Sequence, residues 1–253
     1  MKQSGRLYAS RLAWILSSWF FLLPLLTAVG QPLNSLSLRS QWDSMPARPA
    51  PFRWIAPAVL IPVGLALSPD YSNSHFDRFY IRSEIQGKIH FRTHADDYLQ
   101  YGPAVAWMGM SVAGVKGRSY PLDRLFIGLL AYGISTGVVL GLKHTTHELR
   151  PDGSNYLSFP SGHTANAFTG ARLLDREFGS VSPWIPLSGY AMASSTGLLR
   201  MTNDKHWVSD VLVGAGIGLL STEVVYWVYP WIKKAFTRRE NTHNLSFWLL
   251  NEK

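Results

Sequence analysis

The 253-residue chain contains no cysteine, which excludes disulfide bonds, thiolate metal ligands and a cysteine nucleophile. Charged side chains are also scarce, at 16% against the ~25% that soluble domains usually carry. Acidic residues are the rarer kind, since 16 Asp and Glu stand against 24 Lys and Arg, and the net charge is +8. The basic residues are scattered or flank apolar runs. This distribution argues against nucleic-acid binding and favours contact with anionic lipid head groups.

Apolar residues, by contrast, make up 47% of the chain and aromatic residues 13%, with ten Trp. The mean hydropathy of +0.01 is high for a soluble enzyme and low for a chain that lies wholly in a membrane. A membrane core with sizeable polar loops fits both properties, and the aromatic excess fits belts at the membrane interfaces. The length suits one large domain or two small ones.

Residues 1–30 have the pattern of a targeting or anchoring segment. The basic residues Lys2, Arg6 and Arg11 precede an apolar stretch over residues 12–30, which ends in small residues. This pattern predicts either a cleaved signal peptide or an uncleaved N-terminal anchor. Either one would carry the following chain across a membrane.

Residues 31–100 are expected to form a linker and interfacial helices. Residues 31–54 are rich in Pro, Ser and Arg. Residues 55–68 are apolar but shorter than the ~20 residues that a spanning helix needs, so we expect a short interfacial or buried helix there. Residues 70–97 are polar and aromatic, which predicts surface helices or a loop with surface histidines. These histidines are His75, His90 and His94.

Residues 101–232 are expected to form the functional core, followed by a basic tail over 233–253. The apolar segments of the core are residues 101–115, 125–142, 163–174, 184–199 and 206–231. The second of these is the clearest candidate for a membrane-spanning helix. Glycines at four-residue spacing predict faces where another helix packs closely. They are Gly133, Gly137 and Gly141 in one segment, and Gly214 and Gly218 in another.

Three short stretches in the core carry the candidate chemistry: Lys143–Pro151 (KHTTHELRP), Pro160–His163 (PSGH) and Arg200–Asp210 (RMTNDKHWVSD). Among their side chains are two Arg, a Lys, two His, a Ser at an expected helix start, and an Asp four residues after a His. These groups suit the binding of a phosphoryl group and its transfer through a histidine.

His206 and Asp210 form the first candidate pair, because residues four apart share one face of a helix. An Asp that accepts the proton of Nδ1 leaves Nε2 free as a nucleophile. The alternative is a lone histidine near a membrane interface, satisfied by a nearby carboxylate.

Ser161, Gly162 and His163 form a candidate anion site at the start of a helix. Ser is a favoured N-cap, and the first amides of a helix point toward a bound anion. Gly162 lets the backbone approach phosphate oxygens without an intervening Cβ. The alternative is an ordinary capping turn.

Lys143, Arg150 and Arg200 supply positive charge that stabilises a phosphoryl transition state without a metal. The sequence near them has no acidic cluster that would hold Mg²⁺, so neither a metal nor a cofactor is expected. For Lys143, which directly follows an apolar segment, the alternative is a side chain that extends to the membrane interface. His144 and His147 are expected to be solvent-facing loop residues.

The spacings K-x6-R-P, P-S-G-H and R-x5-H-x3-D, in this order, resemble the signature of the type 2 phosphatidic acid phosphatase and vanadium haloperoxidase superfamily. The resemblance implies an all-α, six-helix membrane-embedded bundle. It also implies that His206 attacks phosphorus to give a phosphohistidine, that Asp210 orients His206, and that His163 protonates the leaving oxygen and then activates water. The implied phosphate-binding residues are Lys143, Arg150, Ser161, Gly162 and Arg200. One departure is Leu199, where the family usually has Ser.

The favoured function is hydrolysis of a lipid phosphate or pyrophosphate, such as phosphatidate, an isoprenoid diphosphate or a lipid A phosphate. The alternatives are a soluble periplasmic acid phosphatase of the same family, a vanadium haloperoxidase, and a non-catalytic lipid-binding or transport relative. Basic residues over 116–124 and 233–239 predict, by the positive-inside rule, that these segments face the cytoplasm. The active site would then face the periplasm from a bacterial-type inner membrane.

Overall fold

The computed structural model describes residues 50–68 and 78–250, with side chains described as far as residue 234. This part of the chain is helical, as predicted, and the expected signal or anchor over residues 1–30 lies outside it. The helices are α3 (Ala50–Ala66), α4 (Arg78–Lys88), α5 (Ala95–Leu99), α6 (Gly102–Val112), α7 (Pro121–Thr146), α8 (Gly162–Phe178), α9 (Trp184–Thr202) and α10 (Val208–Leu250).

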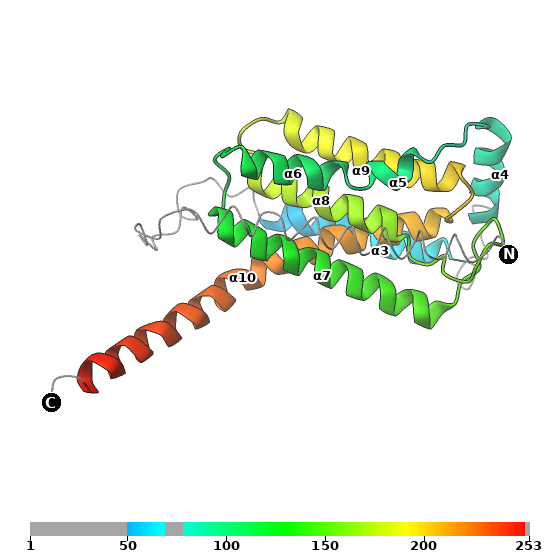
Figure 1. The fold of residues 1–253 in the computed structure, drawn as a ribbon. Coiled ribbons are helices and arrows are strands. Elements are labelled where there is room, and N and C mark those ends of the chain that lie inside the picture. Colours follow the sequence, from blue (N-terminus) through cyan, green and yellow to red (C-terminus); the bar gives the residue numbers. More distant parts are fainter. Residues whose placement is uncertain (1–49, 69–77, 251–253) are drawn as a thin grey trace, which may run out of the picture.

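Six of these helices, α3 and α6 to α10, run along one another as a bundle, whereas the short α4 and α5 lie at one end of it (Figure 1). The predicted six-helix bundle is confirmed, with these two short helices in addition. We call the end that carries α4 and α5 the α4 end. The loop between α6 and α7 marks the opposite end.

Two helical segments in the described part of the chain are long and apolar enough to cross a membrane. They are Pro121–Thr146 in α7 and Val208–Lys234 in α10, which has 67% of its most apolar window buried within the bundle. The first contains the apolar segment 125–142, and the second contains all but the first two residues of the segment 206–231. α3 is shorter and packs along α10, where a Cβ on Gly216 would lie only 2.4 Å from Cγ1 of Ile61.

The glycines of α10 lie where two helices approach closely, as predicted. A Cβ on Gly214 would lie 2.5 Å from the carbonyl oxygen of Ser161, and one on Gly218 would lie 2.4 Å from that of Ala165. Only glycine fits at these positions, so α8 can lie directly against the backbone of α10. This contact fixes the start of α8 beside the start of α10.

The glycines of α7 behave differently, and the prediction that they form a packing face is wrong for the described chain. No atom lies within 4 Å of a Cβ built on Gly133, Gly137 or Gly141. α7 instead packs through its other face, where Ala131 and Val139 are buried. The glycine stripe therefore faces away from the bundle.

Candidate active site

The three sequence stretches meet at the α4 end of the bundle. The first begins in the last turn of α7 and continues into the loop after it, the second opens α8, and the third runs from the end of α9 into α10. Lys143 Nζ donates to the carbonyl oxygens of Leu157 (2.5 Å) and Ser158 (3.2 Å). The backbone N–H of Ser161 donates to the carbonyl of Asp210 at 3.0 Å. These contacts join residues of all three stretches and of the loop between the first two.

His206 and Asp210 form the predicted pair, with 3.3 Å between Nδ1 and Oδ2. Both side chains are buried. The expectation that both stand on a helix is only half met, because α10 begins at Val208. Asp210 lies in the first turn and its Oδ2 also accepts the backbone N–H of Trp207 at 3.0 Å, so the carboxylate caps the helix and holds the histidine that precedes it.

The ring of His206 is held in its neutral form. Burial, followed by the charges of Arg200, Lys143 and Arg150, keeps the pKa of His206 well below its ordinary value of 6.5. A neutral ring whose Nδ1 faces Asp210 presents an unprotonated Nε2 on its other side. This is the state that a nucleophilic histidine needs.

Ser158 is a site residue that the sequence did not reveal. Its hydroxyl donates to Oδ2 of Asp210 at 2.5 Å, and the side chain is fully buried. It therefore helps to fix the carboxylate that orients His206. A single serine in an irregular loop carries no sequence signal of this role.

The second stretch caps α8 as predicted. Ser161 is the N-cap residue, and its hydroxyl oxygen accepts the backbone N–H of Thr164 at 3.4 Å. A Cβ on Gly162 would lie 3.9 Å from Cε of Lys143, so the amide end of α8 and the ammonium-bearing side chain are neighbours. An anion placed between them would meet both.

Arg150 and Arg200 carry buried N–H groups that lack a partner in the described structure. In both, the Nε atom is buried without a hydrogen bond. Burial, followed by the charge of Arg200, lowers the pKa of Arg150. Buried donors of this kind cost free energy unless a ligand satisfies them, and an oxyanion would satisfy them here.

Two carboxylates from α5 join the site, and the sequence did not reveal them. Arg200 Nη1 donates to Oδ2 of Asp96 at 2.6 Å, and Nε2 of His163 lies 3.0 Å from Oδ1 of Asp97. Asp96 is 2% exposed. The one available signal was an acidic doublet in a chain that has few acidic residues.

The sequence predicted no acidic cluster near the cations, whereas the structure places one beside Arg200. Ligand atoms of Asp96, Asp97 and His163 all lie within 4.8 Å of one another, close enough to surround a cation. In this structure, however, the oxygens of Asp96 accept from Arg200 and Asn203, and Asp97 faces His163. The carboxylates thus serve protein cations and donors.

Helix α4 fastens the loops of the first and third stretches. Arg82 donates to both carboxylate oxygens of Asp204, at 2.7 and 2.6 Å. The guanidinium of Arg78 lies 4.4 Å from the ring centre of Trp207 and pairs with Glu148. Since Trp207 adjoins His206, these contacts hold the approach to the nucleophile.

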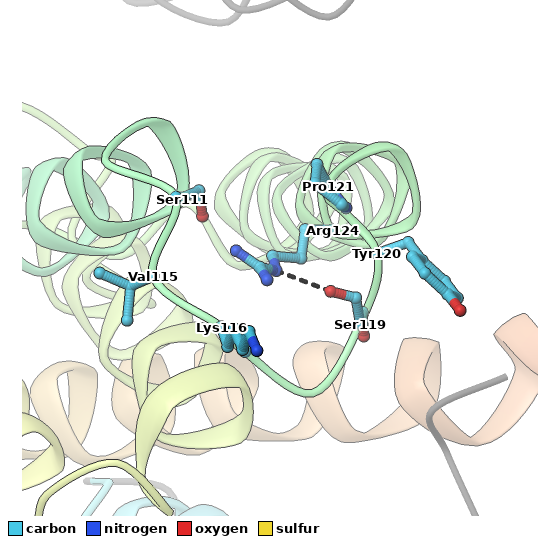
Figure 2. A pocket seen from close by; sticks show the side chains of 9 residues that line it. Ser111, Val115, Lys116, Ser119, Tyr120, Pro121 and Arg124 are labelled. Carbon is cyan, nitrogen blue, oxygen red and sulfur yellow. Dashed lines mark hydrogen bonds between the residues drawn. The ribbon is translucent and has the colours of Figure 1, made fainter. Parts of the chain in front are cut away.

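The other histidines are at the surface, as predicted. His90, His94, His144 and His147 are exposed, whereas His75 lies outside the described residues. Leu199, the departure from the family pattern, is partly buried. A cavity of about 170 Å³ lies at the opposite end of the bundle, lined by Lys116, Ser119 and Arg124 among others (Figure 2). It is no part of this site.

Residues 124–234 match the sequence profile of the PAP2 superfamily. This part of the chain is similar to members of that superfamily. The matched range contains all three stretches and the helices that carry them.

A lipid A 1-phosphatase of Porphyromonas gingivalis is 42% identical over 139 residues, which are 54% of this chain and 31% of that protein. The chain thus matches about a third of the length of this curated relative. The transmembrane PAP2-type phosphatidylglycerolphosphate phosphatase of Bacillus subtilis has a similar fold. Its TM-score is 0.51 at 20% identity, over 70% of this chain and 97% of that one. LpxE of Aquifex aeolicus gives a TM-score of 0.46 at 21% identity, over 58% and 93%.

Proposed function

We propose that the protein hydrolyses a phosphate ester of a membrane lipid through a phosphohistidine on His206. The observation that carries this proposal is the position of the buried His206 near Arg150 and Arg200, whose buried Nε atoms lack a partner in the described structure. A phosphoryl group placed there meets a nucleophile and charge stabilisation together.

The reaction has two steps. Nε2 of His206 attacks phosphorus, the bond from phosphorus to the ester oxygen breaks, and His163 gives that oxygen a proton. A water molecule then attacks phosphorus of the phosphohistidine and passes a proton to His163, the bond from phosphorus to Nε2 breaks, and inorganic phosphate leaves while His206 is restored. Lys143, Arg150, Arg200 and the amide of Gly162 hold the phosphoryl oxygens in both steps.

The substrate we favour is the 1-phosphate of lipid A, on the strength of the likeness to the lipid A 1-phosphatase. A lipid rather than a soluble ester fits the two apolar helices, which reach the site at the end of α7 and the start of α10. Large apolar side chains are also exposed around the site, Tyr98 beside Asp97 and Tyr156 beside Leu157 among them. Phosphatidate and isoprenoid diphosphates are the competing substrates.

The test is phosphate release by the purified protein in detergent, from lipid A, phosphatidate, an isoprenoid diphosphate and p-nitrophenyl phosphate, with EDTA present. We expect lipid A to give the highest kcat/KM, and vanadate to inhibit because it adopts the five-coordinate geometry of the transition state. Activity confined to p-nitrophenyl phosphate would favour the soluble acid phosphatase alternative. Loss of activity with EDTA that Mg²⁺ restores would contradict a metal-free mechanism.

We also propose that the site faces the periplasm. The basic loop between α6 and α7 and the side chain of Lys233 lie at the end opposite the site, which fits the positive-inside rule. In a chain without cysteine, Ser154→Cys near the site and Lys116→Cys at the opposite end place single thiols at exposed positions. A membrane-impermeant maleimide should label the first in intact spheroplasts and the second only after lysis. The reverse pattern would place the site in the cytoplasm.

A further inference from the structure

The α5 carboxylates have no role in the mechanism above, yet they touch two of its residues. Asp97 contacts Nε2 of His163, and Asp96 contacts Arg200. We propose that Asp97 is a positioning residue, which holds Nε2 of His163 and so leaves Nδ1 of that ring to exchange the proton with the leaving oxygen. This inference rests on the proposed function.

The two Asp–His pairs of the site use opposite ring nitrogens. Asp210 lies 3.3 Å from Nδ1 of His206, whereas Asp97 lies 3.0 Å from Nε2 of His163. A carboxylate that accepts from one nitrogen fixes the ring orientation and leaves the other nitrogen for chemistry. Nδ1 is the nitrogen nearer the backbone, and in His163 that backbone is the amide end of α8, where the phosphate would bind.

The helix that carries Asp97 is anchored through the residue next to it, although the side chain of Asp97 is itself half-exposed. Its neighbour Asp96 accepts from Arg200 at 2.6 Å and from Asn203 Nδ2 at 2.8 Å. Asn203 is joined to the chain before α5 by two further hydrogen bonds with the backbone of Thr93. α5 is thus fixed to the end of α9.

The charges around His163 give Asp97 a second effect on that ring. Burial lowers the pKa of His163 and the charge of Arg200 adds to this, whereas the hydrogen bond with Asp97 and the charges of Asp97 and Asp96 favour the imidazolium. Lys143 of α7 lies beside Gly162, and the charge of His163 also acts on His206, which precedes α10. The hydrogen bond to His163 lowers the pKa of Asp97, which keeps this carboxylate ionised and able to favour a proton on His163. His163 can then give a proton to the ester oxygen and take one back from water.

The first test compares Asp97→Asn with the wild type on two leaving groups. A weakened general acid matters for a lipid alkoxide and little for p-nitrophenolate, which leaves without a proton. We expect kcat/KM on the lipid to fall roughly 10- to 100-fold. This is a part of the ~10²- to 10⁴-fold rate increase that general acid–base catalysis typically contributes. On p-nitrophenyl phosphate the change should stay within about threefold. Equal losses on both substrates would overturn the proposal.

Asp97→Glu should recover part of the lipid activity that Asp97→Asn loses. The matched control is Glu84→Gln, which neutralises an exposed carboxylate on α4 and should leave kcat/KM on both substrates unchanged. The alkaline limb of kcat/KM on the lipid should move to lower pH in Asp97→Asn. Without Asp97 the imidazolium of His163 is less favoured, so its acid form is lost earlier as pH rises.

The second test needs no activity, so it separates this inference from the proposed function. ¹⁵N NMR of labelled histidine in detergent reports the tautomer of His163, assigned by its loss in His163→Gln. In the neutral ring of His163 we expect the proton on Nε2 in the wild type, and a mixture of the two tautomers in Asp97→Asn. The pKa of His163 should also be lower in Asp97→Asn than in the wild type. Identical spectra and titration in the two proteins would overturn the positioning role, whichever substrate is cleaved. A wild type that cleaves no phosphate ester would overturn the proposed function alone.

Discussion

The two ends of the bundle both bury cations, but they surround them differently. At the opposite end, Glu177 accepts from Ser119 and Tyr226 and lies 3.4 Å from Arg124, and Arg172 pairs with Glu223 at 2.6 Å. Asp123 there accepts from Tyr229 and Lys233. At the α4 end, Lys143 donates to two carbonyl oxygens, and within the described residues Arg150 keeps a buried Nε without a partner. Arg200 differs from these two, since its Nη1 pairs with Asp96.

This difference distinguishes Lys143 and Arg150 from the ion-paired cations Arg124 and Arg172. Removing either partner of a buried, fully hydrogen-bonded ion pair lowers the stability of the protein, because the remaining charge is left buried without a partner. A buried cation without a carboxylate costs stability in the empty protein and is retained because a ligand supplies the missing charge. We therefore expect substitutions at the opposite end to change stability, and those at the α4 end to change catalysis.

The largest effect is expected for His206→Ala. Loss of the nucleophile should reduce kcat by at least ~10³-fold, while the protein still inserts in the membrane and melts near the wild-type temperature. The measurement is phosphate release from the preferred lipid, normalised to folded protein. Retention of more than a few per cent of activity would show that His206 is not the nucleophile.

Arg150→Ala comes next and tests the unpaired cation. We expect kcat/KM to fall by about 10²- to 10³-fold, as for a lost oxyanion donor, with the melting temperature unchanged or higher because a stranded buried charge is removed. Arg124→Gln is the matched control, since it removes the same charge from an ion pair at the opposite end. It should show the reverse: a lower melting temperature and a normal kcat/KM. The same outcome for both would remove the distinction between the two ends.

Glu177→Gln addresses the opposite end directly. It leaves Arg124 without its carboxylate, and breaking a buried pair in this way costs about 3–5 kcal/mol. Thermal or denaturant unfolding in detergent measures this loss. The turnover of the fraction that remains folded should equal that of the wild type, and a change in its KM would link this cluster to substrate.

The smallest effect concerns pH. Because the pKa of His206 is lowered, its neutral form persists as pH falls, and the acid limb of kcat/KM should lie below the ordinary histidine pKa of about 6.5. Lys143 is one of the charges that cause this, so Lys143→Gln should move the limb to higher pH. A limb that stays in place would mean that another group titrates there.

The sequence predicted the two long apolar helices and the meeting of its three motifs, since hydropathy and spacing along the chain report both. It could not predict Asp96, Asp97 or Ser158, because these act through contacts with residues 52 to 104 positions away and lie in a five-residue helix and a loop without periodicity. Glycine spacing had mixed value. It marks a surface where a helix can approach, and only the fold decides whether one does so, as at Gly214, or does not, as at Gly137.

The most direct test of the account is to trap the phosphoenzyme. The protein is mixed with ³²P-labelled p-nitrophenyl phosphate, stopped in alkaline detergent, and the labelled peptide is mapped. In His163→Ala the phosphohistidine should still form, because p-nitrophenolate leaves without a proton from a general acid. Its hydrolysis should be slow, because the attacking water has lost its general base, so the phosphohistidine should accumulate. The account predicts a label that is stable in base, labile in acid and located on His206. A label on another residue, or turnover with no covalent label in either protein, would contradict it.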